Sequence, residues 1–212
     1  MTKQARSEQT RRLLLDAAAQ LLHRHGYAAT SLVDISRAAG VTKGGLYFHF
    51  SSKDEICDEV QDGAVAMLRE HVARELAAPL PALRRLANLG HTLMRWLDTE
   101  PRVGASFRVA REMGAKDERF VSFSRAWVAQ VHEYVTEAGA RGELRPGVRA
   151  DRATLLVVAV CVGLESAVGG GTVAPETDFA GTLSDLCRFI DLSGPGGGTV
   201  GDGAAADRAA GK

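Results

Sequence analysis

The sequence predicts an all-α protein of about nine helices. Helix-forming residues, chiefly Ala, Leu, Arg and Glu, recur along the chain, and alternating runs of Val, Ile and Thr are missing from it. Apolar residues repeat with helical spacing, and Gly or Pro residues separate the periodic segments. With 212 residues, of which 45% are hydrophobic, the chain can bury a sizeable core in one or two domains.

The first helix is expected over residues 7–25, because Leu14, Ala18 and Leu22 fall on one stripe and the charged residues fall elsewhere. Gly26 is placed to end this helix in a left-handed turn. This first helix should support the shorter elements that follow it.

Two short helices should come next. The first begins after a capping residue at Thr30 or Ser31 and ends at Gly40, and the second begins after Thr42 and continues to Phe50. Two helices joined by a tight turn that contains glycine form a helix-turn-helix. This pattern alone is only moderately specific, because many small helical domains contain a similar turn.

Charge is unevenly distributed, although the net charge is zero. Residues 1–53 contain eight Lys or Arg and three Asp or Glu, and the rest of the chain carries the compensating acidic excess. This asymmetry indicates a basic functional end on a neutral or acidic body.

Gly44 and Gly45 lie at the start of the second short helix, where each weakens the helix by about 1 kcal/mol relative to alanine. Leu46 and Phe50 are four residues apart and should pack inward. Lys43 then lies on the opposite side, where it can reach a guanine edge or a phosphate. The glycines are explained if a DNA groove must approach the backbone closely, and the alternative is that they mark a loop.

The remaining sequence predicts further helices at 52–78, 81–98, 101–113, 117–139, 150–169 and 176–192. We divide the chain into an N-terminal three-helix domain at 1–53, a helical domain at 54–193 and a disordered Gly/Ala-rich tail at 194–212. The longest apolar run is too short to span a bilayer, and neither a signal peptide nor a disulfide framework is indicated. We therefore expect a cytoplasmic protein without a membrane partner.

The stretch from Thr30 to Lys53 reads T-S-x-x-x-I-x-x-x-A-G-V-T-K-G-x-L-Y-x-H-F-x-x-K and closely resembles the DNA-binding signature of the TetR/AcrR family of bacterial repressors. The resemblance implies an N-terminal helix-turn-helix domain and a C-terminal domain for ligand binding and dimerisation. It places the DNA contacts at Thr30, Thr42, Lys43, Gly44, Gly45, Tyr47, Phe48, His49 and Lys53. Gly45 stands where a side chain often reaches a base, which leaves base reading chiefly to Lys43 and Phe48.

Within that family, the stretch TKGGLYFHF is most like the γ-butyrolactone autoregulator receptors, which act as repressors until a lactone or furan signal binds. The resemblance implies a homodimer on a palindromic operator, with the 52–78 helix tilting when ligand binds. The chain could be a lactone receptor or a relative that responds to the antibiotic product.

The 117–139 helix carries an apolar stripe that could line the effector pocket. The alternative is an ordinary core face. By resemblance, Trp127 matches a tryptophan that lines the lactone pocket, and Glu165 could instead lie at the dimer seam. The candidate effector contacts are Trp127, Phe107, Phe123, Gln130, Val131 and Glu165.

No catalytic grouping is recognisable in the sequence. The six histidines lack metal-binding spacing, and the nucleophile-elbow and phosphate-loop motifs are absent. We therefore expect no enzyme activity, metal or cofactor. Two further alternatives are a multidrug-sensing repressor of an efflux pump and an architectural DNA-binding protein that ignores ligands.

Overall fold

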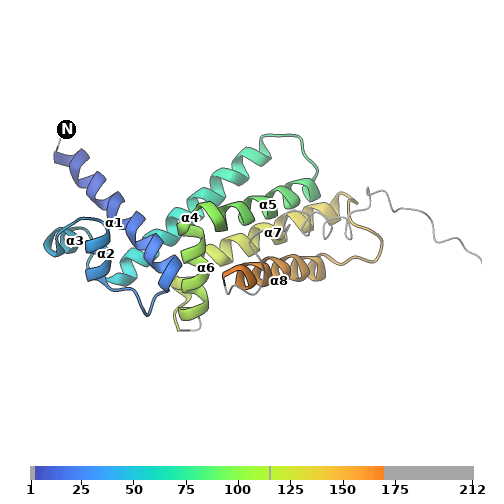
Figure 1. Cartoon of the computed structure of the whole chain (residues 1–212). Coiled ribbons are helices and arrows are strands. Elements are labelled where there is room, and N and C mark those ends of the chain that lie inside the picture. Colours follow the sequence, from blue (N-terminus) through green and yellow to red (C-terminus); the bar gives the residue numbers. More distant parts are fainter. Residues whose placement is uncertain (1–2, 115, 170–212) are drawn as a thin grey trace, which may run out of the picture.

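The computed structural model describes residues 3–114 and 116–169, and those ranges contain helices and no strand. Helices α1 (Lys3–His25), α2 (Leu32–Ala38) and α3 (Lys43–His49) form one end of an elongated molecule (Figure 1). Helix α4 (Lys53–Leu76) begins at this end and runs into the rest of the protein.

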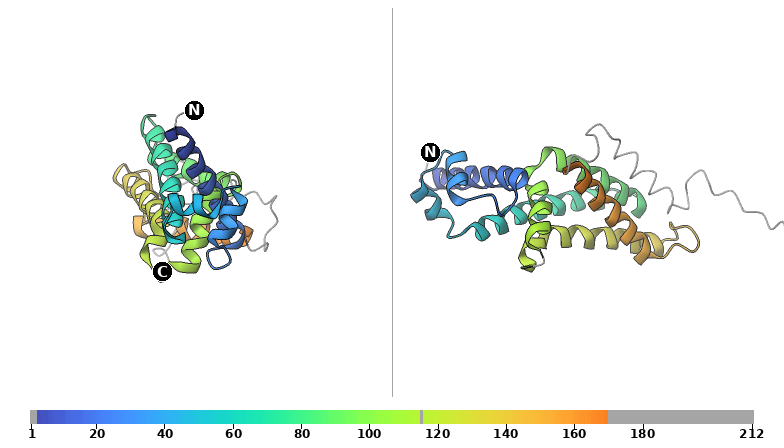
Figure 2. Two further views of the ribbon diagram at one scale, coloured as in Figure 1. Left: turned by 90° about the vertical axis from the view of Figure 1, so that its left-hand side faces the viewer. Right: turned by 60° about the horizontal axis from the view of Figure 1, so that its bottom comes forward.

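The other end, called the body here, consists of packed helices (Figures 1 and 2). These are α5 (Ala82–Thr99), α7 (Ser122–Ala140) and α8 (Ala150–Gly169), of which α8 crosses the long axis of the molecule obliquely. Helix α6 (Pro101–Met113) crosses between the two ends and contacts α1, α4 and α5. A short 3₁₀ helix, η1 (Glu118–Val121), precedes α7.

The local signals in the sequence set most helix ends. The side-chain oxygens of Ser31, Thr42 and Ser52 each accept a hydrogen bond from the backbone N–H three residues later, at 3.1 Å. A cap of this kind is worth about 1 kcal/mol. Gly26 and Gly40 end α1 and α2 with φ values of +80° and +66°, which confirms the predicted left-handed turn at Gly26.

Two predicted boundaries differ from the structure. Helix α1 begins four residues earlier than expected, and the segment predicted as one helix over 117–139 is divided into η1 and α7. The division arises because the Asp117 carboxylate accepts a bond from the backbone N–H of Arg119 at 2.9 Å and starts a tighter turn. The predicted helix at 176–192 and the predicted tail at 194–212 lie outside the described residues.

The buried apolar side chains form two clusters. The N-terminal cluster consists of Leu14, Ala18, Ala19, Leu22, Ile35, Leu46, Phe50, Ile56, Cys57, Val60, Ala105, Val109 and Phe120. The body cluster is contributed by α4 to α8, from Ala64 to Cys161. Because the N-terminal cluster includes residues of α4, α6 and η1, it extends past residue 53, and the predicted domain boundary there stays a prediction.

Candidate nucleic-acid interface and effector core

Helix α3 is held on the protein by a buried inner face. Leu46 and Phe50 are at most 1% exposed and pack with Ile35 of α2 in the N-terminal cluster. The guanidinium of Arg11 lies 5.2 Å from the centre of the Phe50 ring and pairs with Glu59 of α4. Helices α1, α2 and α4 therefore fix the base of α3.

The outer face of α3 carries rings and a cation that the core does not use. Phe48 is 79% exposed and Tyr47 is 49% exposed. The Lys43 Nζ lies 5.8 Å from the centre of the Tyr47 ring, and the His49 ring meets Phe48 edge-on at 5.2 Å. Burying a side chain as large as Phe is worth about 1.5–3 kcal/mol, so the exposed ring suits a surface that a partner covers.

The two glycines of α3 have different surroundings. Apart from the adjoining residues and the backbone of the helix itself, no atom lies within 4 Å of the position that a Cβ would take at Gly44, so the backbone there is open. A Cβ at Gly45 would lie 2.9 Å from Cγ1 of Val41 and 3.2 Å from Oγ1 of Thr42. Gly45 therefore avoids a steric clash within the chain. The interpretation that a partner approaches bare backbone still applies to Gly44.

Two residues that were expected to contact the DNA backbone are engaged within the protein. The Thr30 side chain is 3% exposed and donates to the carbonyl oxygen of Gly26 at 2.7 Å, which corrects the expectation, because an enclosed hydroxyl cannot reach DNA. The Lys53 Nζ donates to the carbonyl oxygens of Tyr27 and Thr30 at 2.8 and 2.9 Å. Lys53 thus fixes the α1–α2 turn, whereas Thr42 is exposed and can still donate its O–H.

Four of the predicted effector residues lie together in the body cluster. Phe123, Trp127 and Val131 follow one stripe of α7 and are at most 1% exposed. Phe107 of α6 meets Phe123 edge-on, with ring centres 5.5 Å apart. The contacts alone are also those of an ordinary core face.

Several polar atoms at this core have no hydrogen-bond partner in the protein. They include the indole N–H of Trp127, the hydroxyl of Tyr134 and Nε2 of His71. Leaving such a group unpaired costs about 1–3 kcal/mol. Burial raises the pKa of Tyr134, opposed by Arg85, whose guanidinium lies 4.9 Å from the ring centre. A small molecule with oxygen atoms on an apolar frame would satisfy these groups.

Gln130 does not belong to the body cluster, although it was expected beside Trp127. Its amide donates to Glu133 at 3.1 Å. Gln130 lines a groove of about 310 Å³ between α4 and α7, whose apolar wall includes Val65 and Leu68 of the body cluster. The groove therefore borders the body cluster, with which it shares these two residues.

Glu165 pairs with Arg111 of α6 and is 8% exposed. This contact ties α8 to α6, so the Glu165 carboxylate is already engaged by a cation of the protein.

The contacts that join the two ends involve residues that the sequence analysis did not single out. Arg108 donates to the carbonyl oxygens of His23 and Arg24 at 3.3 and 3.0 Å, and Glu112 accepts from the backbone N–H of Tyr27 at 2.8 Å. The spacing of Arg108 and Glu112 was visible as an i, i+4 pair of opposite charge. Their partners at the end of α1 and in the turn after it are distant in sequence and left no signal.

Helix α8 exposes large apolar side chains. Leu155, Leu156 and Val162 are 69%, 46% and 37% exposed. In the described ranges no helix is both long and apolar enough to cross a bilayer. The same ranges contain no group of three or more His, Cys, Asp or Glu side chains arranged to hold a metal ion.

Residues 14–60, from the middle of α1 to the first part of α4, match the model of the tetR family of bacterial regulatory proteins. The chain therefore carries a TetR-family N-terminal domain. The A-factor receptor protein of Streptomyces griseus is 48% identical to it over 62 residues, which are 29% of this chain and 22% of the receptor. The chain spans between 22% and 41% of the length of several such curated relatives.

Solved structures extend the likeness over the body. A γ-butyrolactone receptor described as ArpA-like covers 87% of this chain with a TM-score of 0.68, and 97% of the receptor is covered, at 24% identity. At that identity the likeness shows the fold, which agrees with the predicted all-α architecture.

The TetR family protein CprB of Streptomyces coelicolor, solved in complex with its operator, covers 87% of this chain with a TM-score of 0.67. The match covers 98% of CprB at 25% identity. Curated relatives are named as a receptor or as transcriptional regulators, in agreement with the expectation that this chain is not an enzyme.

Proposed function

We propose that this protein is a ligand-responsive transcriptional repressor of the TetR type that binds a palindromic operator. The observation that carries the proposal is the outer face of α3, where Lys43, Tyr47 and Phe48 stand exposed on a helix whose inner face is buried. A helix fits the major groove of B-DNA, where lysine can bind a guanine edge and an apolar ring can contact a thymine methyl group. The open backbone at Gly44 lets the groove approach closely.

The proposal includes a homodimer. The exposed Leu155, Leu156 and Val162 on α8 supply apolar surface for a second copy of the chain. One recognition helix as short as α3 makes few contacts, and a two-fold pair doubles them on a palindromic site. Two such helices must then lie about 34–36 Å apart, which is one turn of DNA.

Selection from a random duplex library tests the DNA-binding part. The wild-type protein should enrich a palindrome, and its affinity should fall steeply with salt. Tyr47→Ala should weaken binding by about 1–3 kcal/mol, measured by mobility shift. Leu76→Ala is a matched control, because Leu76 is 59% exposed at the far end of α4. Enrichment of no duplex, or full affinity in Tyr47→Ala, would contradict the proposal.

The proposed effector is a small hydrophobic molecule of the γ-butyrolactone type or a related compound. Its support is the unpaired Trp127 N–H and Tyr134 hydroxyl among apolar side chains, since a lactone offers oxygen acceptors beside an alkyl chain. The effector needs to prefer the non-binding arrangement of the DNA-binding helices by only a few kcal/mol. The protein would then act in the bacterial cytoplasm, where its operator lies.

Synthetic 2-acyl-γ-butyrolactones of graded chain length test the effector class. They should release the selected duplex, and Trp127→Phe should raise the concentration needed, because it removes the N–H and keeps an aromatic ring. Release by unrelated hydrophobic drugs and not by lactones would favour the multidrug alternative. Absence of release by any lactone, drug or culture extract would favour the architectural alternative.

A further inference from the structure

The segment from Phe120 to Phe123 connects the two hydrophobic clusters. Phe120 is 2% exposed in the N-terminal cluster, where its ring centre lies 5.4 Å from that of Tyr27. Phe123 is fully buried in the body cluster against Phe107. Because η1 passes directly into α7 here, few residues separate Phe123 from Phe120. A displacement of Phe123 is therefore expected to move Phe120 as well.

A buried amide on α4 fixes this connecting segment. Gln61 is 1% exposed, and its Nε2 donates to the carbonyl oxygen of Arg119 at 3.1 Å. Its Oε1 accepts from the hydroxyl of Ser122 at 3.2 Å and from the backbone N–H of Phe123 at 3.4 Å. Val121, the N-cap residue of α7, supplies no side-chain cap, so Gln61 satisfies the start of α7 from another helix.

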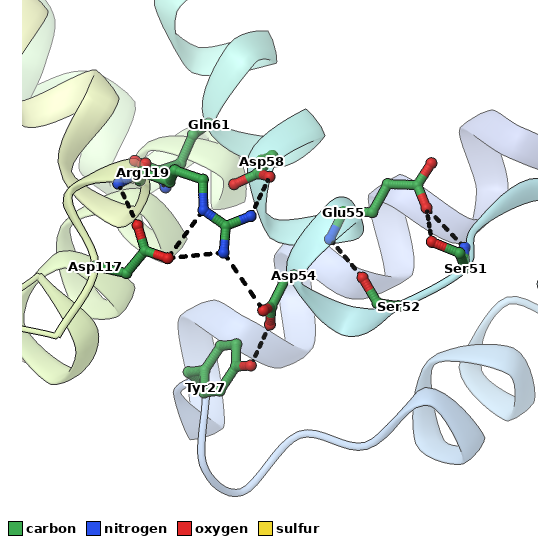
Figure 3. A network of polar contacts seen from close by, with 9 residues as sticks. All are labelled: Tyr27, Ser51, Ser52, Asp54, Glu55, Asp58, Gln61, Asp117 and Arg119. Carbon is green, nitrogen blue, oxygen red and sulfur yellow. Dashed lines mark hydrogen bonds and ion pairs between the residues drawn. The ribbon is translucent and has the colours of Figure 1, made fainter.

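The Arg119 side chain extends the connection to the start of α4 (Figure 3). Its guanidinium bonds Asp117 at 2.7 Å and lies 3.4 Å from Asp58 and 3.7 Å from Asp54. Asp54 in turn accepts a hydrogen bond from the hydroxyl of Tyr27, in the turn between α1 and α2. One cation therefore joins η1 to α4 and, through Asp54, to the end of α1.

The energetic role of Arg119 is chiefly to hold carboxylates together. Its ion pairs are half-exposed, so solvent screens them and each contributes little to stability by itself. Burial raises the pKa of Asp58, Arg119 opposes this effect, and the neighbouring Asp54 adds to it. Without the guanidinium, these carboxylates would repel one another, and the start of α4 would lose its fixed position relative to η1.

We infer that Gln61 and Arg119 are positioning residues that convert a change in the body cluster into a change in the position of the DNA-binding helices. The inference rests on the proposed function and specifies its regulation. The route starts at Phe123, one turn before Trp127, and passes through Gln61 and Arg119 to the first turns of α4, directly after α3. It is a contiguous chain of packed and hydrogen-bonded groups, which is one means by which coupling between distant sites is carried.

A double-mutant cycle tests this without any effector. Phe123→Leu loosens the body cluster beside η1 and is made alone and together with Arg119→Gln. Affinity is measured for a duplex selected with the wild-type protein. We expect Phe123→Leu to weaken binding about fivefold or more in the otherwise native chain, and less than about twofold beside Arg119→Gln.

Two matched variants act as controls. Arg125→Gln removes the Arg125–Glu118 pair, 3.0 Å long and confined to η1 and α7, so the full effect of Phe123→Leu should remain. Arg119→Lys retains the cation and should restore part of that effect, which loss of a merely structural contact would not explain.

The outcomes separate this inference from the proposed function. Equal weakening of binding in both backgrounds, or no weakening in the native chain, overturns the inference while DNA binding stands. If the wild-type protein selects no duplex, the proposed function fails, and amide hydrogen exchange over residues 26–36 replaces affinity. Exchange accelerated by Phe123→Leu must then return to normal beside Arg119→Gln, and acceleration in both backgrounds, or in neither, overturns the inference.

Discussion

The two ends of the molecule depart from ordinary packing in opposite ways. The α3 end exposes aromatic side chains that could have been buried, with Phe48 at 79% and Tyr47 at 49%. The body encloses polar groups that could have been solvated, including the Trp127 N–H and the Tyr134 hydroxyl. Each departure is unfavourable in the free protein. Under the proposed function, the DNA would cover the exposed rings from outside the fold, and the effector would satisfy the enclosed polar groups from inside it.

The largest expected effect on stability comes from comparing the buried and the exposed phenylalanine near the end of α3. Phe50→Ala should lower the free energy of unfolding by about 3–5 kcal/mol, because Phe50 is 1% exposed in the N-terminal cluster. Phe48→Ala should change it by less than about 0.5 kcal/mol and should weaken duplex binding instead. Urea unfolding and mobility shift measure the two quantities. Comparable destabilisation by both substitutions would show that Phe48 serves the fold.

Removing an enclosed polar group of the body should change the free energy of unfolding less than Phe50→Ala does, and it should not lower it. Tyr134→Phe removes a buried hydroxyl that has no partner and leaves the ring in place, so stability without effector should be unchanged or slightly increased. Urea unfolding of the free protein measures this. A loss of more than about 1 kcal/mol would mean that the hydroxyl already has a partner in the unliganded protein.

The smallest expected effect concerns pH. Burial lowers the pKa of His71 in the folded protein, although Glu75 acts in the opposite direction and Arg74 acts with burial. Below the unfolded value of about 6.5, the unfolded chain binds the extra proton more readily, so acidification should reduce the free energy of unfolding.

Urea unfolding at about pH 7.5 and about pH 5.5 measures this loss of stability. His71→Leu should make the loss smaller, whereas His132→Asn should leave it unchanged, because His132 is exposed. An identical loss in wild type and His71→Leu would remove His71 as its source.

The helices and the outer face of α3 were predictable because their signals are local. Caps at Ser31, Thr42 and Ser52 and the left-handed Gly26 depend on neighbours within a few residues. The inward position of Phe50 followed from helical spacing alone. Such features require no knowledge of the rest of the chain.

The differences arose at a contact between residues distant in sequence, for Lys53, and in tight local turns that residue spacing does not specify, for Thr30 and Gly45. Lys53 was expected to face phosphate, but it bonds carbonyl oxygens of the α1–α2 turn, and Thr30 is enclosed by the same turn. Gly45 faces Val41 rather than open space. Gln61 carried a detectable signal, because a polar residue interrupts the buried stripe of α4, but its partners on η1 could not be inferred from spacing.

The spread of the N-terminal cluster across α4, α6 and η1 bears on the engineering of chimeric regulators. A graft that exchanges only the first 53 residues would leave Ala105, Val109 and Phe120 facing a foreign surface to which their shapes are not matched. The matching of Gly26 to Glu112 and of Gly104 to His23 would be lost as well. A DNA-binding domain that is to be transferred therefore has to include the residues of α6 and η1 that support it. The segment to be exchanged is thus discontinuous in sequence.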